Sequence, residues 1–290
     1  MQPPKCYVND PLVPQAYTKT QAVARLVFGD RSCTGWLVGS EGHLITNHHC
    51  MESQDVASNT QYEFGAESPS CDDECVTVGS CRGTIAATMA TFLHADEKLD
   101  YAIIKLNAVV DLSQFGFLKL RVAGGVEKEQ IYIPQHPGGR AKTLAVTVDG
   151  GDVARASMGV SDSCGAYRVA YTADTEKGSS GSPIIGAKDN AVIGLHSCGA
   201  PATGACINSA LDVRTLIFEL QKLNLVPRDA LDDPNAQLAN GPWIPSTPAP
   251  TAPTPAPTPL DTCPGWRSKS TCEVFTRGAC VWTGTKCVKP

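Results

Sequence analysis

Short runs of apolar and β-branched residues, separated by glycine-rich turns, occupy the chain up to about residue 210 of 290. We expect strands at 22–28, 34–38, 43–46, 101–106, 130–133 and 191–195. Turns containing glycine lie between them, as at 39–42 and 137–139. Many short strands joined by such turns are typical of a β-barrel or β-sandwich, so the pattern predicts an all-β domain.

One segment near the end of this region has a helical period instead. Between residues 210 and 223, the apolar residues Leu216, Ile217, Leu220 and Leu223 recur three and four positions apart. Apolar residues at that spacing line one face of an α-helix. The sequence therefore predicts an amphipathic helix at about 210–223 that closes the domain.

A change in composition divides the chain after this domain. We expect a folded domain at 1–228, a linker rich in Pro and Thr at 229–262, and a small module at 263–290. Proline alternates with small residues at 245–259. Because proline lacks a backbone N–H and has a fixed φ, this composition favours extended polyproline II over helix or sheet.

The predicted module contains four cysteines and two tryptophans in 28 residues, namely Cys263, Cys272, Cys280, Cys287, Trp266 and Trp282. A piece of this size cannot build an adequate apolar core, and two disulfides would supply the missing constraint. The tryptophans could stack on sugar rings of a glycan or cell-wall surface, or simply pack on the disulfides. Both interpretations stay open.

The bulk composition narrows the class of protein. A formal net charge of −5, without a long run of either sign, gives no support to a nucleic-acid partner. No stretch approaches the roughly 18 apolar residues needed for a membrane span. The 13 cysteines indicate disulfides formed outside the cytosol, in a secreted protein. Beyond the motifs below, Cys198 and Cys206 flank a short loop and could pair with each other. Cys71, Cys75 and Cys81 crowd an insertion, which leaves Cys6 and Cys164.

Three local patterns occur in the order His, Asp, Ser. A hairpin expected at 33–50 ends on His48-His49-Cys50, and a Cys33–Cys50 disulfide would hold its two strands together. Asp100 stands directly before the buried strand at 101–106. Ser180 lies in the glycine-flanked turn Gly-Ser-Ser-Gly-Ser-Pro at 178–183, which leads into another strand.

These residue types together form a nucleophilic site. A serine hydroxyl needs a base within hydrogen-bond reach, and neutral histidine can take its proton and return it to a leaving amine. A carboxylate selects the useful histidine tautomer and stabilises the imidazolium. The backbone N–H groups of Gly178 and Ser180 would stabilise the oxyanion. No cofactor or metal is expected.

The three motifs, in this order, resemble those of chymotrypsin-clan (trypsin-like) serine endopeptidases, nearer the bacterial glutamyl and lysyl endopeptidases than the digestive trypsins. The resemblance implies two six-stranded antiparallel β-barrels, at about 20–120 and 121–210, with the triad in the cleft between them. It implies that His49 is the general base, Asp100 its orienting acid and Ser180 the nucleophile. His48-His49-Cys50 alone could be a metal cluster, and Asp96 is a rival acid further from the strand.

The same resemblance marks the residues that would choose the substrate. The segment 192–199 resembles a wall of the primary specificity pocket, in which Ser197 would back the triad acid. Ser197 and Gly199 would pair with a peptide substrate. His196 and Thr175 could accept an acidic side chain, whereas Asp174 matches the spacing of the acid that gives trypsin its basic preference. We expect a charged P1 residue, with a lean to Lys or Arg and with Glu left open.

Two alternatives concern these pocket residues and the chain as a whole. His196 could be a satisfied structural histidine and Asp174 could point to solvent. The chain could also be a catalytically silent homologue that acts as a binding or inhibitory module. One departure from the family pattern is Ser179, which stands where zymogen-activated relatives carry an aspartate, so activation through that salt bridge is not expected.

Overall fold

The computed structural model describes residues 1–290 except 74, 161–166, 200–207, 237–280, 283–286 and 289–290. The chain divides into two units, Met1–Pro245 and Ser246–Pro290. In the second unit, β15 (Val281–Trp282) pairs antiparallel with β16 (Cys287–Val288). The rest of the predicted four-cysteine module lies outside the described residues.

A seven-stranded antiparallel sheet forms the first half of the larger unit. Its strands are β1 (Val23–Phe28), β2 (Arg31–Val38), β3 (His43–Thr46), β4 (Gln61–Phe64), β5 (Thr84–Ala87), β6 (Ala90–Asp96) and β7 (Tyr101–Leu106). They are ordered β5-β4-β1-β2-β3-β7-β6. Its core includes the fully buried side chains of Leu26, Trp36, Leu44, Tyr62 and Ile104.

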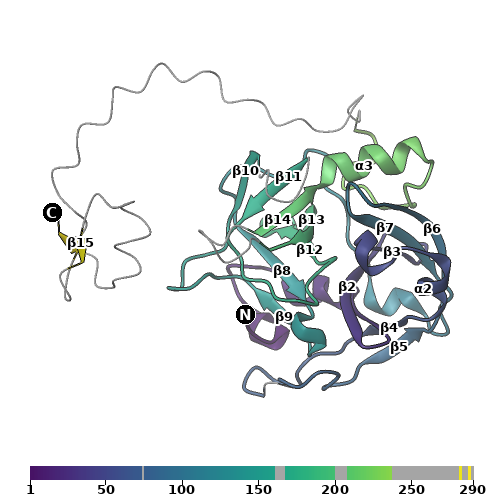
Figure 1. The fold of residues 1–290 in the computed structure, drawn as a ribbon, viewed down its shortest axis with the longest axis horizontal. Helices are drawn as coiled ribbons and strands as arrows, with labels where there is room; N and C mark the ends of the chain where they lie inside the picture. Colours follow the sequence, from purple (N-terminus) through teal and green to yellow (C-terminus); the bar gives the residue numbers. More distant parts are fainter. Residues whose placement is uncertain (74, 161–166, 200–207, 237–280, 283–286, 289–290) are drawn as a thin grey trace. The chain divides into compact units, whose positions relative to one another are not determined.

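A second seven-stranded sheet follows in the chain. Its strands are β8 (Ile131–Gln135), β9 (Thr143–Ala145), β10 (Ala156–Val160), β11 (Arg168–Tyr171), β12 (Pro183–Gly186), β13 (Val192–Cys198) and β14 (Asn208–Asp212). Their order is β10-β11-β14-β13-β12-β8-β9. Figure 1 shows this sheet beside the first one, with β8 and β12 on the side that faces β2.

The predicted fold class, an all-β unit made of two antiparallel barrels, is confirmed, but each sheet has seven strands rather than six. In the first sheet, β5 and β6 stand at opposite ends of the order although only residues 88–89 separate them. The chain therefore bends at this point and closes the barrel. In the second sheet, Ile131 N donates to Ala154 O, so the segment that enters β10 returns to β8. Each extra strand is thus a consequence of a bend at a barrel corner.

Helices are few and short. The 3₁₀ helices are η1 (Pro4–Tyr7), η2 (Thr20–Ala22), η3 (His48–Cys50), η4 (Leu112–Phe115) and η5 (Pro137–Gly139). The α-helices are α1 (Ala16–Lys19), α2 (Gln54–Ser58) and α3 (Val213–Lys222). No helix within the described residues is long and apolar enough to cross a membrane.

The predicted closing helix is present but begins three residues later than expected. Residues 210–212 belong to β14, which pairs with both β11 and β13. Asp212 then caps the helix, because its Oδ1 accepts a hydrogen bond from Arg214 N at 2.8 Å. Leu216, Ile217 and Leu220 are buried as the period predicted. Figure 1 shows α3, in light green, following β14.

The linker expected from residue 229 begins later in the chain. Ala230 O accepts from Leu120 N at 2.7 Å, and Asp232 N donates to Leu120 O at 3.1 Å. Residues 229–232 are therefore part of the folded unit, because these backbone bonds attach them to the segment between the two barrels. The Pro/Thr-rich segment itself lies outside the described residues.

Candidate active site

Two neighbouring strand ends of the first barrel present His49 and Asp100. His49 lies in η3, directly after β3, and the Cys33–Cys50 disulfide joins η3 to β2 with a Cα–Cα distance of 6.2 Å. Asp100 immediately precedes β7, which pairs with β3 through the Thr46–Ala102 register. The strand pairing therefore brings the histidine and the carboxylate to the same edge of the barrel.

The two side chains make a well-formed contact. His49 Nδ1 lies 3.0 and 2.9 Å from Asp100 Oδ1 and Oδ2, and His49 N donates to Oδ1 at 3.1 Å. The His49 side chain is 47% exposed and that of Asp100 18%. When Nδ1–H donates to the carboxylate, Nε2 keeps its lone pair and can act as a base.

Asp96, the rival acid, and the cysteines beside His49, the possible metal ligands, each have another partner. Asp96 Oδ1 accepts from Leu99 N at 2.9 Å, so the rival acid shapes the turn that leads to Asp100. Cys33 Sγ and Cys50 Sγ lie near His49, but these sulfurs are bonded to each other. A disulfide has no thiolate to offer a metal ion.

The turn that carries Ser180 packs directly on the first barrel. Ser180 O accepts from Thr34 N at 2.9 Å, and an added Cβ at Gly181 would lie 2.2 Å from Thr34 O. Gly181 has φ +87°, so glycine is required there for both reasons. Among the described residues no hydrogen bond joins the Ser180 hydroxyl to His49. Such bonds are often long in enzymes without substrate.

Two backbone N–H groups of this turn are free to bind an anion. Within the described part of the chain, neither the Gly178 nor the Ser180 N–H donates a hydrogen bond. The carbonyls on the other side of these two peptide groups are bonded: Lys177 O accepts from Gly138 N, and Ser179 O accepts from Ser182 N at 3.0 Å. Because C=O and N–H point in opposite directions in a trans peptide, these bonds fix the direction of the free N–H groups.

Thr34 connects this turn with both barrels. Its hydroxyl donates to Gly178 O at 2.9 Å and accepts from His136 N at 3.0 Å. Gly178 has φ +91°, and an added Cβ would lie 2.7 Å from His136 O. The sequence analysis did not single out Thr34; its position directly after Cys33 was the only available signal.

His196 and Ser197, on β13, are both buried. Burial lowers the pKa of His196 to about 4, and its Nδ1 is hydrogen-bonded to the Tyr171 hydroxyl. The ring is therefore neutral at pH 7 and already has a partner. Ser197 Oγ accepts from Arg168 Nη1, a partner that the sequence analysis missed. These contacts agree with the structural interpretation of His196.

The remaining predicted pocket residues are more accessible. Asp174 and Thr175 are half-buried and Gly199 is exposed. Asp174 O accepts from Gln135 Nε2 at 2.8 Å, whereas its carboxylate has no partner among the described residues. Ser179, in place of the family's aspartate, is fully buried, and its Oγ accepts from Glu176 N at 3.2 Å.

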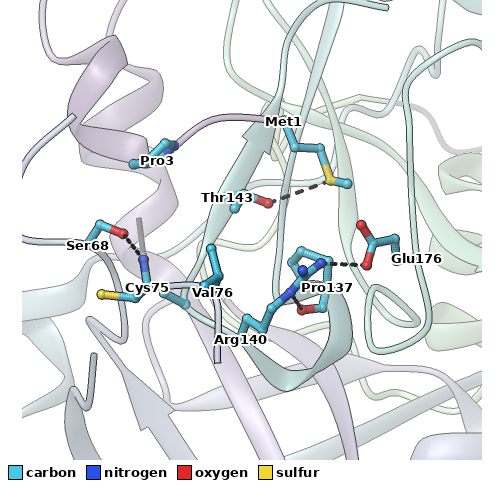
Figure 2. Close-up of a pocket in the computed structure, with 10 residues that line it drawn as sticks. Met1, Pro3, Ser68, Cys75, Val76, Pro137, Arg140, Thr143 and Glu176 are labelled. Carbon is cyan, nitrogen blue, oxygen red and sulfur yellow. Dashed lines mark hydrogen bonds and ion pairs between the residues drawn. The ribbon is translucent and has the colours of Figure 1, made fainter. Parts of the chain in front are cut away.

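A pocket of about 220 Å³ adjoins the segment that precedes the Ser180 turn. Figure 2 shows Arg140 and Glu176 pointing toward each other at its rim, where they form an ion pair at 2.5 Å. Met1 and Thr143 line the pocket at another side. The candidate triad residues do not line it, so the pocket lies beside the candidate active site.

Two further disulfides join cysteines outside this site, and one of them links the N-terminal segment to the insertion at 71–81. Cys6 is bonded to Cys71, and Cys75 to Cys81. Cys198 is also disulfide-bonded. Cys164 and Cys206, the latter its suggested partner, lie outside the described residues.

The chain belongs to the trypsin-like peptidase domain family, which residues 33–195 match. It is 43% identical over 222 residues to Secreted RxLR effector protein 73 of Plasmopara viticola, across 74% of this chain and 53% of that protein. It is 27% identical over 179 residues to an uncharacterized protein of Sinorhizobium fredii, across 58% of this chain and 25% of the relative. The chain thus spans about half the length of the first relative and about a quarter of the second.

Solved proteases have the same fold. A protease from M. tuberculosis in its active form has a TM-score of 0.52 at 17% identity, over 79% of this chain and 93% of that one. The serine endoprotease from Yersinia pestis has a TM-score of 0.51 at 14% identity, over 71% and 64%. Likeness at these identities concerns the fold alone.

Proposed function

We propose that this protein is a serine endopeptidase in which Ser180 attacks the peptide carbonyl. His49 takes the serine proton and returns it to the leaving amine, while Asp100 holds the imidazole and stabilises its charged form. The Gly178 and Ser180 N–H groups bind the oxyanion of the tetrahedral intermediate. The peptide C–N bond breaks as an acyl-enzyme forms on Ser180, and water then hydrolyses the ester.

The observation that carries this proposal is the contact between His49 Nδ1 and both Asp100 carboxylate oxygens, at 2.9 and 3.0 Å. A carboxylate beside Nδ1 favours the tautomer with the proton on Nδ1, which leaves Nε2 able to act as a base. The two unbonded N–H groups beside Ser180 support the same chemistry, because oxyanion donors must be free before substrate binds.

Replacing the nucleophile tests the proposal. Ser180→Ala should remove peptide hydrolysis and labelling by a fluorophosphonate, since both need the hydroxyl, and should leave the fold intact by circular dichroism. Ser113→Ala is the matched control, because Ser113 is exposed and its hydroxyl donates to Asp111 Oδ2 at 2.7 Å, outside the proposed site. Wild-type protein that resists the probe, under conditions that label a control protease, would instead favour the silent homologue.

We further propose that the protein is secreted. The Plasmopara viticola relative is named a secreted effector. The Cys6–Cys71, Cys33–Cys50 and Cys75–Cys81 disulfides are typical of proteins made in an oxidising compartment. The effector name also supports the second candidate function, a catalytically silent binding or inhibitory module. The fluorophosphonate experiment separates this function from the first. Binding of a glycan or cell-wall surface by the C-terminal module remains a proposal from the sequence.

For the primary specificity we propose a basic P1 residue, Lys or Arg. The Asp174 carboxylate is half-buried and free of partners among the described residues, so it can pair with a cationic side chain. His196, the residue that would accept Glu, is buried, neutral at pH 7 and bonded to Tyr171. Cleavage-site profiling on a peptide library should give Lys and Arg at P1; a Glu preference would overturn this proposal.

A further inference from the structure

Arg168 places a buried positive charge in the neighbourhood of Asp100. It is the first residue of β11 and its side chain is 2% exposed. Nη2 donates to Leu99 O at 3.0 Å, and Nη1 donates to Ser197 Oγ. Burial lowers the pKa of Arg168, and the Asp100 charge opposes that change. The arginine is therefore in electrostatic contact with the acid of the proposed triad.

The hydrogen-bond partners of Arg168 do not by themselves compensate its buried charge. Both hydrogen-bonded acceptors are neutral oxygens, and no ion pair within the described residues includes Arg168. Burying a guanidinium without a counter-charge costs several kcal/mol. Asp100 is the negative group that acts on it, so the arginine and the carboxylate stabilise each other across the boundary between the two barrels.

The position of the hydrogen bonds points to a role in the site. Leu99 O belongs to the peptide group directly before Asp100, and Asp100 O accepts from Asn47 Nδ2 at 2.8 Å. The backbone of Asp100 is thus held on both sides. Asp100 has φ +56°, a left-handed conformation that is unfavourable for a non-glycine residue. Two flanking hydrogen bonds are a physical means of keeping it there.

We propose that Arg168 is a positioning residue for the triad: it fixes the Leu99–Asp100 peptide and the Ser197 hydroxyl, and its charge acts on the His49–Asp100 pair. This inference rests on the proposed function for its catalytic meaning. Ser197 accepts from Arg168, which leaves its own O–H free to donate. The charge of a guanidinium and its two-armed geometry are separate properties, so they can be tested by different substitutions.

The positive charge of Arg168 predicts how its removal should change the pH dependence of kcat/KM. Asp100 is hydrogen-bonded to the His49 imidazole, Arg168 and His196 both interact electrostatically with Asp100, and His48 stands beside His49 in η3. His196 is neutral near pH 7, so Arg168 is the cation among them. Removing that cation leaves Asp100 unopposed and favours the imidazolium. The pKa of His49, and with it the acidic limb of kcat/KM, should therefore rise.

The first experiment measures the His49 titration by proton NMR in a Ser180→Ala background, with His49→Ala used to assign the signal. In Arg168→Gln the titration of His49 should move to higher pH, because the cation that acts on the Asp100 carboxylate is lost. Arg121→Gln is the matched control, since Arg121 is also buried but pairs with Glu129 and Asp189. It should leave His49 unchanged.

The second experiment measures kinetics with an intact Ser180. Arg168→Lys keeps the positive charge but loses the planar guanidinium that bonds Leu99 O and Ser197 Oγ together. We expect kcat to fall about tenfold, while KM and the acidic limb of the pH profile of kcat/KM stay near their wild-type values. This variant also tests the proposal by itself if Arg168→Gln does not fold. Full kcat in Arg168→Lys would overturn the positioning role.

The two experiments separate this inference from the proposed function. A His49 pKa that rises in Arg168→Gln supports the inference even if wild-type protein hydrolyses no peptide, in which case the proposed function alone fails. An active wild type whose His49 pKa is the same with and without Arg168 overturns the inference and leaves the proposed function standing.

Discussion

Thr34, a residue of the first barrel, forms hydrogen bonds that hold the turn with Ser180 in place. It is fully buried, and its hydroxyl bonds both Gly178 O and His136 N. Its own carbonyl accepts from Thr46 Oγ1 at 2.8 Å, at the end of the strand that leads to His49. The Thr34 hydroxyl therefore holds the Gly178–Ser179 peptide group, which lies between the two peptide groups that carry the proposed oxyanion donors.

Thr34→Val should lower kcat about 10- to 100-fold with little change in KM. Valine has the same shape but leaves Gly178 O and His136 N without their partner, and one misplaced oxyanion donor costs on the order of 10²–10³ in rate. Each unpaired buried group should also cost about 1–3 kcal/mol of unfolding free energy. Steady-state kinetics and urea unfolding measure both effects. Thr34→Ser keeps the hydroxyl and should retain most activity; normal kcat in Thr34→Val would contradict the role.

Helix α3 begins at Val213, whereas the apolar period of the sequence predicted a start near residue 210. The apolar period continues back into residues 210–212, but those residues pair with two strands. Helix initiation then depends on Asp212, which is fully buried and accepts from the backbone and side chain of Arg214. A cap marks a helix boundary more sharply than an apolar period does.

Asp212→Ala should reduce the free energy of unfolding by about 1–2 kcal/mol, because it removes the cap of α3. Arg214 is partly exposed, so its guanidinium can be hydrated once the carboxylate is gone. Urea unfolding followed by circular dichroism gives this value. Asp212→Asn keeps a capping oxygen and should lose less; equal losses in the two variants would assign the effect to charge instead of capping.

At the scale of the molecule, a buried lysine helps join the N-terminal segment to the second barrel. Lys142 is fully buried, and its Nζ donates to Thr20 O at 2.7 Å. Burial lowers the pKa of Lys142 to about 8, while Glu67 at 3.6 Å opposes that change. Gln2 pairs with Leu144 nearby, so residues before β1 complete the surface of the second barrel.

The lowered pKa makes stability depend on pH. Between about 8 and the ordinary value of 10.5, the unfolded chain binds more protons at Lys142 than the folded chain does. The free energy of unfolding should therefore rise with pH across this window, most clearly from pH 8 to 9.5, before tyrosines titrate. Urea unfolding of wild type and Lys142→Met at both pH values measures the difference. The slope should be smaller in Lys142→Met, and identical slopes would contradict this account.

Local features of the sequence predicted the all-β class, the positions of six of the 14 strands in the two sheets with a seventh after the Ser180 turn, and the three motifs. These signals are short-range: alternating apolar runs, glycine turns, and chemistry-bearing residues next to a strand end. The order His, Asp, Ser identified the candidate triad without any contact information. The sequence also predicted that Leu216, Ile217 and Leu220 would form a buried helix face.

Contacts between residues far apart in the chain decided the rest. The bends that give seven strands in each sheet depend on barrel closure, and the pairing of Cys6 with Cys71 depends on which loops meet. Arg168 lies 68 residues after Asp100, and Thr34 lies 144 before Gly178. A hydrogen bond across that separation leaves no local pattern, because it is formed by the packing of the two barrels. The sequence by itself therefore determined the candidate chemistry, and the tertiary structure decided what holds it in place.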